Sequence, residues 1–311
     1  MTKVLYVLGR GRSGSTIFAS VIGQYGGFFS TGELRYLWDP IVKDDVACAC
    51  GEHVSRCPIW GKVLEQIGEI SIDDASNMQR QIVTERKLLR SLRYRGDGSW
   101  RDLDAYVDLT SRVYTAIHDV TGASVIVDSS KRPSYGAVLR HVFGSDVYWL
   151  HLIRDPRASA HSWGHSRHAS VFGQDTEVQR RGPIDSTIRW DILNLEAEAL
   201  QRKVPAYRAS QLRYEDFLAN PEQATAQVIN FIGEESMSSP FLDGRTASLK
   251  PSHALGGNPS KMSVGRVAIH QTTDWISEQK TVDRWLATAV ALPFLRKYGY
   301  RLTVESPPAE V

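Results

Sequence analysis

The sequence predicts an α/β fold, in which a mainly parallel sheet of about five strands carries helices on both faces. Short apolar runs, typical of buried strands, alternate along the chain with longer stretches of helical periodicity. Polar clusters follow several of these runs, as they do at the carboxyl edge of an open α/β sheet. We expect one domain over residues 1–311, with a helical, cysteine-containing excursion at about residues 44–122.

The composition of the sequence indicates which classes of partner the protein is not expected to bind and in which cell compartment it is expected. With 42% hydrophobic and 23% charged residues, the chain is typical of a globular protein, and its net charge of +2 does not favour nucleic acid as a partner. No apolar run approaches the roughly 18 residues of a membrane span, and the first strand begins at residue 3, which leaves no room for a signal peptide. We therefore expect a cytoplasmic protein without a membrane span.

The first predicted strand leads into a glycine-rich loop and then a helix. Val4 to Leu8 are apolar, Gly9 to Gly14 form the loop, and Ser15 to Ile22 have apolar residues at helical spacing. This order directs backbone N–H groups and the positive end of a helix dipole toward one anion. The bland alternative is a glycine turn with no ligand, which two arginines among the glycines disfavour.

The loop resembles a Walker A motif in its frame but not in its key cation. Gly9 and Gly14 have the spacing of G-x-x-x-x-G-K-[ST], and Thr16 occupies the hydroxyl position. Ser15 replaces the lysine that reaches the β- and γ-phosphates, which argues against ATP or GTP hydrolysis but keeps the phosphate cradle. Arg12 can supply a cation instead. We predict a P-loop-like fold.

Residues 12–16, R-S-G-S-T, resemble the loop of sulfotransferases that use 3′-phosphoadenosine 5′-phosphosulfate (PAPS), which reads R/K-S-G-T/S-T. The resemblance implies that the 5′-phosphosulfate binds to the loop and the start of the helix. The implied cofactor-binding residues here are Gly11, Arg12, Ser13, Gly14, Ser15 and Thr16.

Residues 28–33 predict a second short strand that ends in the carboxylate of Glu33, before a helical stripe at 34–42. A single glutamate is most often a surface charge or a helix-cap partner. In the tyrosylprotein and carbohydrate branch of the resembled family, the glutamate of a comparable G-E segment is the general base. The resemblance therefore implies that Glu33 is catalytic.

All three cysteines lie in C-x-C-G-x-H-x-x-x-C, from Cys48 through Cys50 and His53 to Cys57. Three thiols and an imidazole can form a tetrahedral zinc site, although this cysteine spacing is uncommon for zinc. Buried reduced thiols or one disulfide are the alternatives. A similar insertion occurs in bacterial sulfotransferase-like sequences. We interpret the segment as structural and assign no metal.

The rest of the excursion predicts three helices, near residues 60–67, 73–95 and 100–120. Five basic residues between Arg86 and Arg95 make the second of these helices basic. A solvated face explains such a run, and attraction of an acidic acceptor is the alternative.

Residues 124–128 predict a buried strand that ends in the polar cluster Ser129 to Pro133. The cluster suits a helix cap as well as a site at the end of a strand. It resembles the family segment whose lysine contacts the transferred sulfuryl group. The resemblance implies that Lys131 is catalytic, together with Arg12 and Glu33.

A further apolar strand at 146–154 leads into a helix that begins near Pro156. The family carries R-D/N-P-[RK]-x-x-x-x-S at this place, where the arginine and the serine bind the 3′-phosphate. Arg154 and Ser162 match this spacing. The histidines at positions 161, 165 and 168 are interpreted as polar helix residues and not as metal ligands.

The last third of the chain predicts a mobile polar loop at 174–184, a helix at 184–203, a strand at 206–213, a helix after Pro221 and a long loop at 236–266. A final helix is expected at 286–295. By resemblance, Tyr214 in L-R-Y-E-D packs near the nucleotide. The long loop at 236–266, here called the late segment, closes over the cofactor in the family, and Ser260 and Lys261 would contact the phosphates.

The implied reaction moves the sulfuryl group of PAPS to a hydroxyl of a small molecule, carbohydrate or phenol and releases 3′-phosphoadenosine 5′-phosphate (PAP) without a metal. Glu33 would take the acceptor proton, while Arg12 and Lys131 stabilise developing negative charge. A P-loop kinase or NTPase is the alternative, in which Asp155 is the candidate magnesium ligand. A non-catalytic nucleotide-binding protein is a second alternative.

Overall fold

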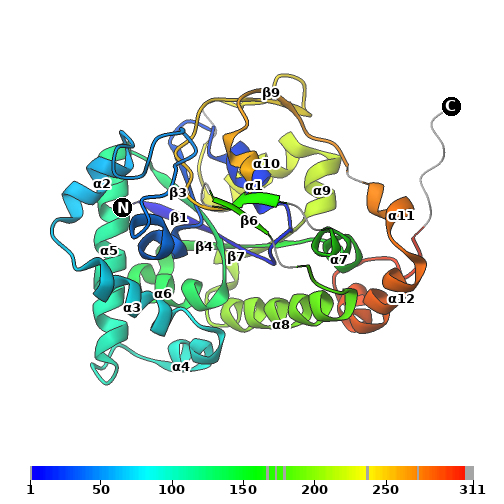
Figure 1. Ribbon diagram of the computed structural model, residues 1–311, viewed down its shortest axis with the longest axis horizontal. Coiled ribbons are helices and arrows are strands. Elements are labelled where there is room, and N and C mark those ends of the chain that lie inside the picture. Colours follow the sequence, from blue (N-terminus) through cyan, green and yellow to red (C-terminus); the bar gives the residue numbers. More distant parts are fainter. Residues whose placement is uncertain are drawn as a thin grey trace.

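The computed structural model describes residues 2–165, 168–171, 174–177, 180–235, 238–271 and 273–304. Its centre is a five-stranded parallel sheet of order β2-β3-β1-β4-β7 (Figure 1). The strands are β1 (Lys3–Leu8), β2 (Phe28–Gly32), β3 (Val125–Lys131), β4 (Val147–Ile153) and β7 (Ala209–Arg213). This confirms the predicted α/β class and the parallel five-stranded sheet.

Alternation along β1 divides the core into two layers. Val4, Tyr6 and Leu8 belong to one apolar cluster, whereas Leu5 and Val7 belong to another on the opposite face. All five side chains are fully buried, because helices cover both faces of a parallel sheet.

Helices cover each face of the sheet, as predicted. One face packs on α1 (Ser15–Ile22), α9 (Tyr214–Ala219) and α10 (Pro221–Ile232). The other packs on α5 (Arg101–Thr121), α6 (Pro133–Phe143) and α8 (Pro183–Gln201). Figure 1 shows α8 and α1 on opposite sides of the strands. Trp149 and Tyr6, in edge-to-face contact at 5.5 Å, fill the second layer.

The excursion is helical, but its second helix is interrupted. The segment contains α2 (Trp60–Ile67), α3 (Ile72–Ile82), a 3₁₀ turn (Glu85–Lys87) and α4 (Leu88–Arg93). The continuous helix predicted over residues 73–95 is wrong, because Val83 and Thr84 leave the helical region and turn the chain. Ahead of them, residues 34–42 form a 3₁₀ turn (Leu34–Tyr36) and a π turn (Leu37–Val42) with an extended Asp39.

Two predicted loops contain short antiparallel ladders. β6 (Gln174–Glu177) lies in the predicted loop at 174–184 and pairs with β5 (His168–Val171). β8 (Thr246–Leu249) and β9 (Gly265–Ala268) pair within the segment predicted as a loop at 236–266. Residues 236 and 237 of that prediction lie outside the described residues. Four-residue strands are too short to show a periodicity, which explains both errors.

The remaining described α-helices are α7 (Pro156–Gly164), α11 (Asp274–Glu278), α12 (Thr281–Val290) and α13 (Leu292–Lys297). The single final helix predicted at 286–295 is therefore two helices, separated at Ala291. No helix in the described ranges is long and apolar enough to cross a membrane.

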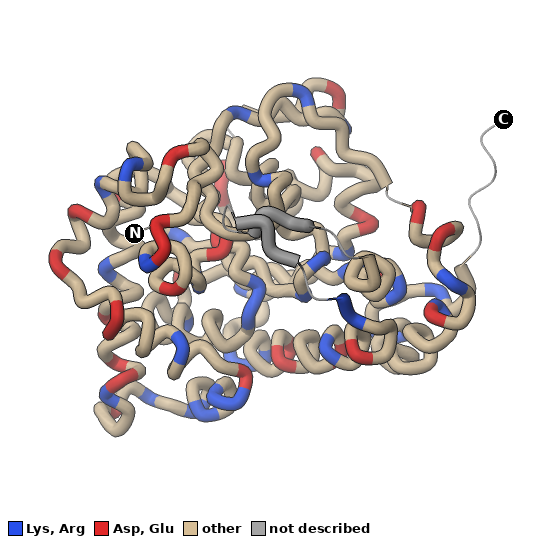
Figure 2. Tube along the Cα trace, viewed as in Figure 1, with Lys and Arg blue, Asp and Glu red and all other residues tan. Residues whose placement is uncertain are grey.

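Lys and Arg residues are interspersed with Asp and Glu residues along the chain trace (Figure 2), in agreement with the small net charge. The basic run near α4 has a structural partner. The Arg90 guanidinium lies 4.0 Å from the centre of the Trp100 ring, and the Lys87 ammonium lies 5.8 Å from it. Cation–π contact accounts for two of its charges without an acidic acceptor.

Candidate active site

The carboxyl ends of four strands meet at one edge of the sheet. Leu8 pairs with Lys131 of β3 and with His151 of β4, and Gly32 of β2 pairs with Asp128. The segments that follow these strands therefore emerge side by side. This is the edge at which open α/β sheets bind ligands.

The glycine loop after β1 presents the start of α1 to this edge. Gly14 is the N-cap residue with φ 82°, and no side chain caps the helix. The first amide groups of an α-helix lack partners within the helix, so they are available to an anion. A β-carbon on Gly14 would lie 2.0 Å from the Tyr214 ring, which shows how closely the ring approaches the loop.

A cavity of about 680 Å³ lies between the loop, the strand ends and the late segment. Its lining includes most of the predicted site residues, which come from six separate segments of the chain: Gly11, Arg12, Gly14, Ser15, Thr16, Glu33, Lys131, Arg154, Ser162, Tyr214 and Ser260. The motifs recognised separately in the sequence thus come together in space.

Two predicted residues are absent from this lining. Ser13 is buried below the loop, and its N–H donates to the carbonyl of Arg10 at 3.1 Å. Lys261 is partly buried near Glu33 and Cys48; burial lowers the pKa of its ammonium, and these two neighbours act in the opposite direction. Both residues lie next to the cavity and not on its wall.

Glu33 and Lys131 form a buried ion pair at the cavity. The Lys131 Nζ lies 2.5 Å from Glu33 Oε1 and 3.3 Å from the carbonyl of Ser129, and both charged side chains are 11% exposed. An ammonium has three N–H donors, so the third can reach a ligand. Lys131 itself has φ 69° and Arg12 has φ 73°, a region that non-glycine residues rarely adopt.

The late segment holds Glu33 from the other side. The N–H of Glu33 donates to the carbonyl of Leu255 at 2.7 Å, and the N–H of Leu255 donates to the carbonyl of Thr31 at 2.8 Å. Gly32, with φ 77°, permits this approach, since a β-carbon there would lie 2.1 Å from the Leu255 carbonyl oxygen. The backbone thereby orients the Glu33 carboxylate before any ligand binds.

Arg154 joins the main cavity to a second cavity of about 510 Å³, and Tyr214 lines both. The Arg154 guanidinium donates to the carbonyl of Arg12 at 2.9 Å and lies 5.2 Å from the Tyr214 ring centre. Ser162, within α7, lines the main cavity. The predicted pair therefore lies beside the glycine loop.

The cavity is strongly cationic. Burial, together with the charges of Arg132, Arg181 and Arg189, lowers the pKa of the Arg10 guanidinium to about 10. Its Nε is buried without a hydrogen-bond partner among the described residues, and the guanidinium lies 5.1 Å from the Trp163 ring. Such mutual repulsion is relieved when a polyanion binds.

Asp155 is engaged in structure and is not available to magnesium. Its side chain accepts from the N–H and Nε of Arg157 at 2.8 and 2.9 Å and from Arg157 Nη2 at 2.7 Å. The pair is buried and caps the start of α7. The acidic residue that the kinase or NTPase alternative requires is thus paired with arginine.

Several cavity residues were missed by sequence reasoning, namely Arg10, Arg35, Tyr36, Trp163 and Asn258. Arg10 belongs to the glycine loop, and Trp163 directly follows Ser162, so proximity to a motif was the available signal. Arg35, Tyr36 and Asn258 belong to no recognised motif, so the sequence offered no signal that they line the cavity. His161, by contrast, does not line the cavity; its Nε2 lies 3.4 Å from Glu278.

A β-carbon on Gly14 tests the loop geometry. We expect Gly14→Ala to abolish anion binding at the loop and to lower the melting temperature, because the residue has a left-handed backbone and the new methyl group overlaps the Tyr214 ring. Gly122→Ala is the control: it shares a positive φ of 65°, but a β-carbon there would meet nothing within 4 Å. Calorimetric titration with PAP and thermal unfolding check both variants. Equal losses of PAP affinity in Gly14→Ala and Gly122→Ala would show that the close approach of Tyr214 to Gly14 does not matter for binding.

Comparison with known proteins decides the family. The model of the "Sulfotransferase family" matches residues 5–238, about three quarters of the chain. The chain belongs to the sulfotransferase family. A search of curated proteins gave no match.

Two solved structures are given for comparison, and the first of them supports the fold. The sulfotransferase domain from the curacin biosynthetic pathway is 16% identical, with a TM-score of 0.54 over 97% of this chain and 99% of that one. The sulfotransferase domain of the Synechococcus PCC 7002 olefin synthase is also 16% identical, with a TM-score of 0.48 over 97% and 98%. The family supports sulfuryl transfer as the general chemistry of this sulfotransferase and disfavours the kinase or NTPase alternative.

Proposed function

We propose that this sulfotransferase takes the sulfuryl group from PAPS and transfers it to an acceptor hydroxyl. The observation that carries the proposal is one cationic cavity that joins the glycine loop to Arg154 and Ser162. PAPS has anionic groups at both ends of its ribose, which suits two separated anion-binding regions. Two further features suit a phosphate-containing ligand. The buried Nε of Arg10 has no hydrogen-bond partner among the residues that the structure describes, and no side chain caps the start of α1.

The proposed chemistry places a base and a cation together at the transferred group. Glu33 accepts the proton of the acceptor hydroxyl, and Lys131 donates to the oxygen on which charge develops as the sulfur–oxygen bond breaks. The ion pair of Glu33 and Lys131 orients both side chains before the acceptor arrives. Arg12 and the amides at the start of α1 would bind the phosphosulfate.

The acceptor is proposed to be a small molecule, carbohydrate or phenol. The cavity wall combines the aromatic rings of Tyr36 and Trp163 with polar groups such as Asn258 and His270, which suits a ligand with both apolar and hydroxyl surfaces. A panel of phenols, sugars and aliphatic alcohols, assayed by PAP release, distinguishes these classes. No release with any hydroxyl compound, but release with amines, would contradict the acceptor proposal.

We predict that PAP binds without magnesium and that ATP competes poorly. Ser15 occupies the position of the Walker lysine, and Asp155 is paired with Arg157, so the cavity offers cationic side chains in place of a metal ion. Calorimetry with PAP and ATP, each with excess magnesium and with chelator, measures this. Magnesium-dependent binding that prefers ATP would overturn the proposal.

A further inference from the structure

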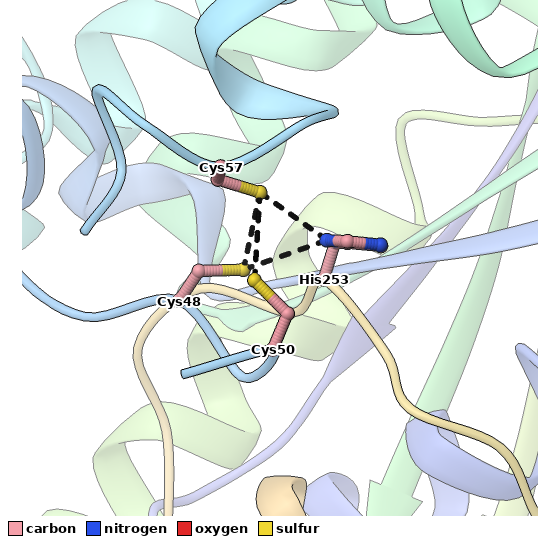
Figure 3. Close-up of side chains that lie close together, drawn as sticks. All are labelled: Cys48, Cys50, Cys57 and His253. Carbon is pink, nitrogen blue, oxygen red and sulfur yellow. Dashed lines mark hydrogen bonds between the residues drawn. The ribbon is translucent and has the colours of Figure 1, made fainter. Parts of the chain in front are cut away.

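Three thiols and one imidazole converge beside the active site. Figure 3 shows the sulfurs of Cys48, Cys50 and Cys57 gathered beside a ring nitrogen of His253, a residue distant in sequence. The Cys57 sulfur lies 3.7 Å from that of Cys48 and 3.8 Å from that of Cys50. His253 Nδ1 lies 3.2 Å from the Cys57 sulfur and 3.9 Å from the Cys48 sulfur.

These separations match the edges of a tetrahedron around one ion. Zinc binds cysteine sulfur at about 2.3 Å and histidine nitrogen at about 2.0 Å, which for tetrahedral angles places two sulfurs about 3.8 Å apart and a sulfur and a nitrogen about 3.5 Å apart. The four ligand atoms all lie within 4.8 Å of one another. A single metal centre therefore explains all the contacts. A disulfide would use only two of the sulfurs and would not explain why the third thiol and the imidazole lie beside them.

Hydrogen bonds hold the cysteine loop and the segment around His253 together. The N–H of Ala49 donates to the carbonyl of Ala254 at 3.2 Å, and Trp60 Nε1 donates to the carbonyl of His253 at 2.6 Å. Within the cysteine loop, the N–H of Cys57 donates to the carbonyl of His53 at 2.8 Å. These bonds hold the four side chains in place from independent parts of the chain.

His53, the imidazole that the sequence pattern offered, is not part of the cluster. Its Nδ1 contacts the carbonyl of Asp45 at 2.5 Å, and its side chain is 63% exposed. The sequence pattern offered His53, whereas the imidazole that lies beside the three sulfurs belongs to His253, about two hundred residues further along the chain.

We propose that Cys48, Cys50, Cys57 and His253 bind one structural Zn²⁺. Four protein ligands leave no open position for water or substrate, which is the arrangement of structural and not catalytic zinc sites. Cys48 and Cys57 are buried, and Cys50 and His253 are half-buried, so the ion would be shielded from solvent. This proposal replaces the expectation of no metal and does not depend on the proposed reaction.

A zinc site here would connect the cysteine-containing excursion to the part of the cavity that contains Glu33. Leu255, two residues after His253, pairs with Thr31 and Glu33, and Gly257 approaches both Glu33 and Thr16. A zinc ion would therefore fasten the late segment over the end of β2. Loss of the ion is expected to loosen the segment that orients the Glu33 backbone.

Metal analysis of the purified protein tests the proposal. We expect one zinc per chain by inductively coupled plasma mass spectrometry after purification in reductant and dialysis against zinc-free buffer. Cys57→Ser and His253→Ala should lower the zinc content at least tenfold, whereas His53→Ala, the matched control, should retain it. Zinc that is lost with His53→Ala but kept with His253→Ala would overturn the assignment.

A second measurement uses the unaltered protein, so it stands if the cysteine variants fail to fold. X-ray absorption at the zinc edge is expected to show three sulfur neighbours at about 2.3 Å and one nitrogen at about 2.0 Å. Removal of zinc by chelator should lower the melting temperature, and added zinc should restore it. Absence of zinc after incubation with zinc salts, a shell of nitrogen and oxygen only, or a disulfide among the three cysteines in reductant would each overturn the proposal.

Discussion

Replacement of Glu33 by glutamine is expected to lower turnover by about 10² to 10⁴-fold, the usual contribution of a general base. Glutamine keeps the shape of the side chain and can still accept from Lys131, but it cannot take the proton of the acceptor. PAP affinity and the melting temperature should therefore stay unchanged. Steady-state rates with an aliphatic alcohol, together with calorimetry, measure the two effects separately.

Glu234→Gln is the matched control for this variant. Glu234 also pairs with a lysine, since its Oε1 lies 2.7 Å from the ammonium of Lys3, but this pair is at the amino end of β1, away from the cavity. Its turnover should remain normal. The loss with Glu33→Gln should shrink for an acidic acceptor such as a nitrophenol, which needs less help from a base. A near-normal rate on the aliphatic alcohol would show that another group is the base.

Arg154→Ala is expected to weaken PAP binding far more than binding of adenosine 5′-phosphosulfate, which lacks the 3′-phosphate. A hydrogen bond to a charged group contributes about 1.5 to 3 kcal/mol, so PAP affinity should fall about tenfold to a hundredfold for each bond lost. Arg154 also donates to the carbonyl of Arg12, and loss of that contact should weaken both ligands alike. The difference between the ligands isolates the 3′-phosphate contribution.

Calorimetry with both ligands on wild type, Arg154→Ala and Ser162→Ala measures this difference. Ser162→Ala should show the same preference on a smaller scale, because a neutral hydroxyl forms a weaker bond to phosphate than a guanidinium. Equal losses for the two ligands with Arg154→Ala would mean that the arginine only supports the glycine loop.

Strong local patterns were predicted well from sequence. Residues 146–154 form a largely apolar run, and β4 (Val147–Ile153) is buried throughout, because both faces of a central parallel strand are covered. The glycine loop was located because it combines a strand, glycines at a set spacing and an apolar helix. Weak patterns failed at short elements: β8 and β9 span four residues each, and the break after α3 depends on the backbone conformation of two residues, Val83 and Thr84.

The sequence by itself determined the individual strands, the glycine loop and the order of the motifs, because each of these features depends on residues within one short segment. Tertiary structure alone decided which side chains meet. The ion pair of Lys131 with Glu33 joins the ends of two strands, and the approach of Tyr214 to Gly14 joins segments about two hundred residues apart. His253 reaches the cysteines for the same reason. The order of the strands and the path of the loops set the distances between side chains that are far apart in sequence, and neither can be predicted from the spacing of residues within one segment.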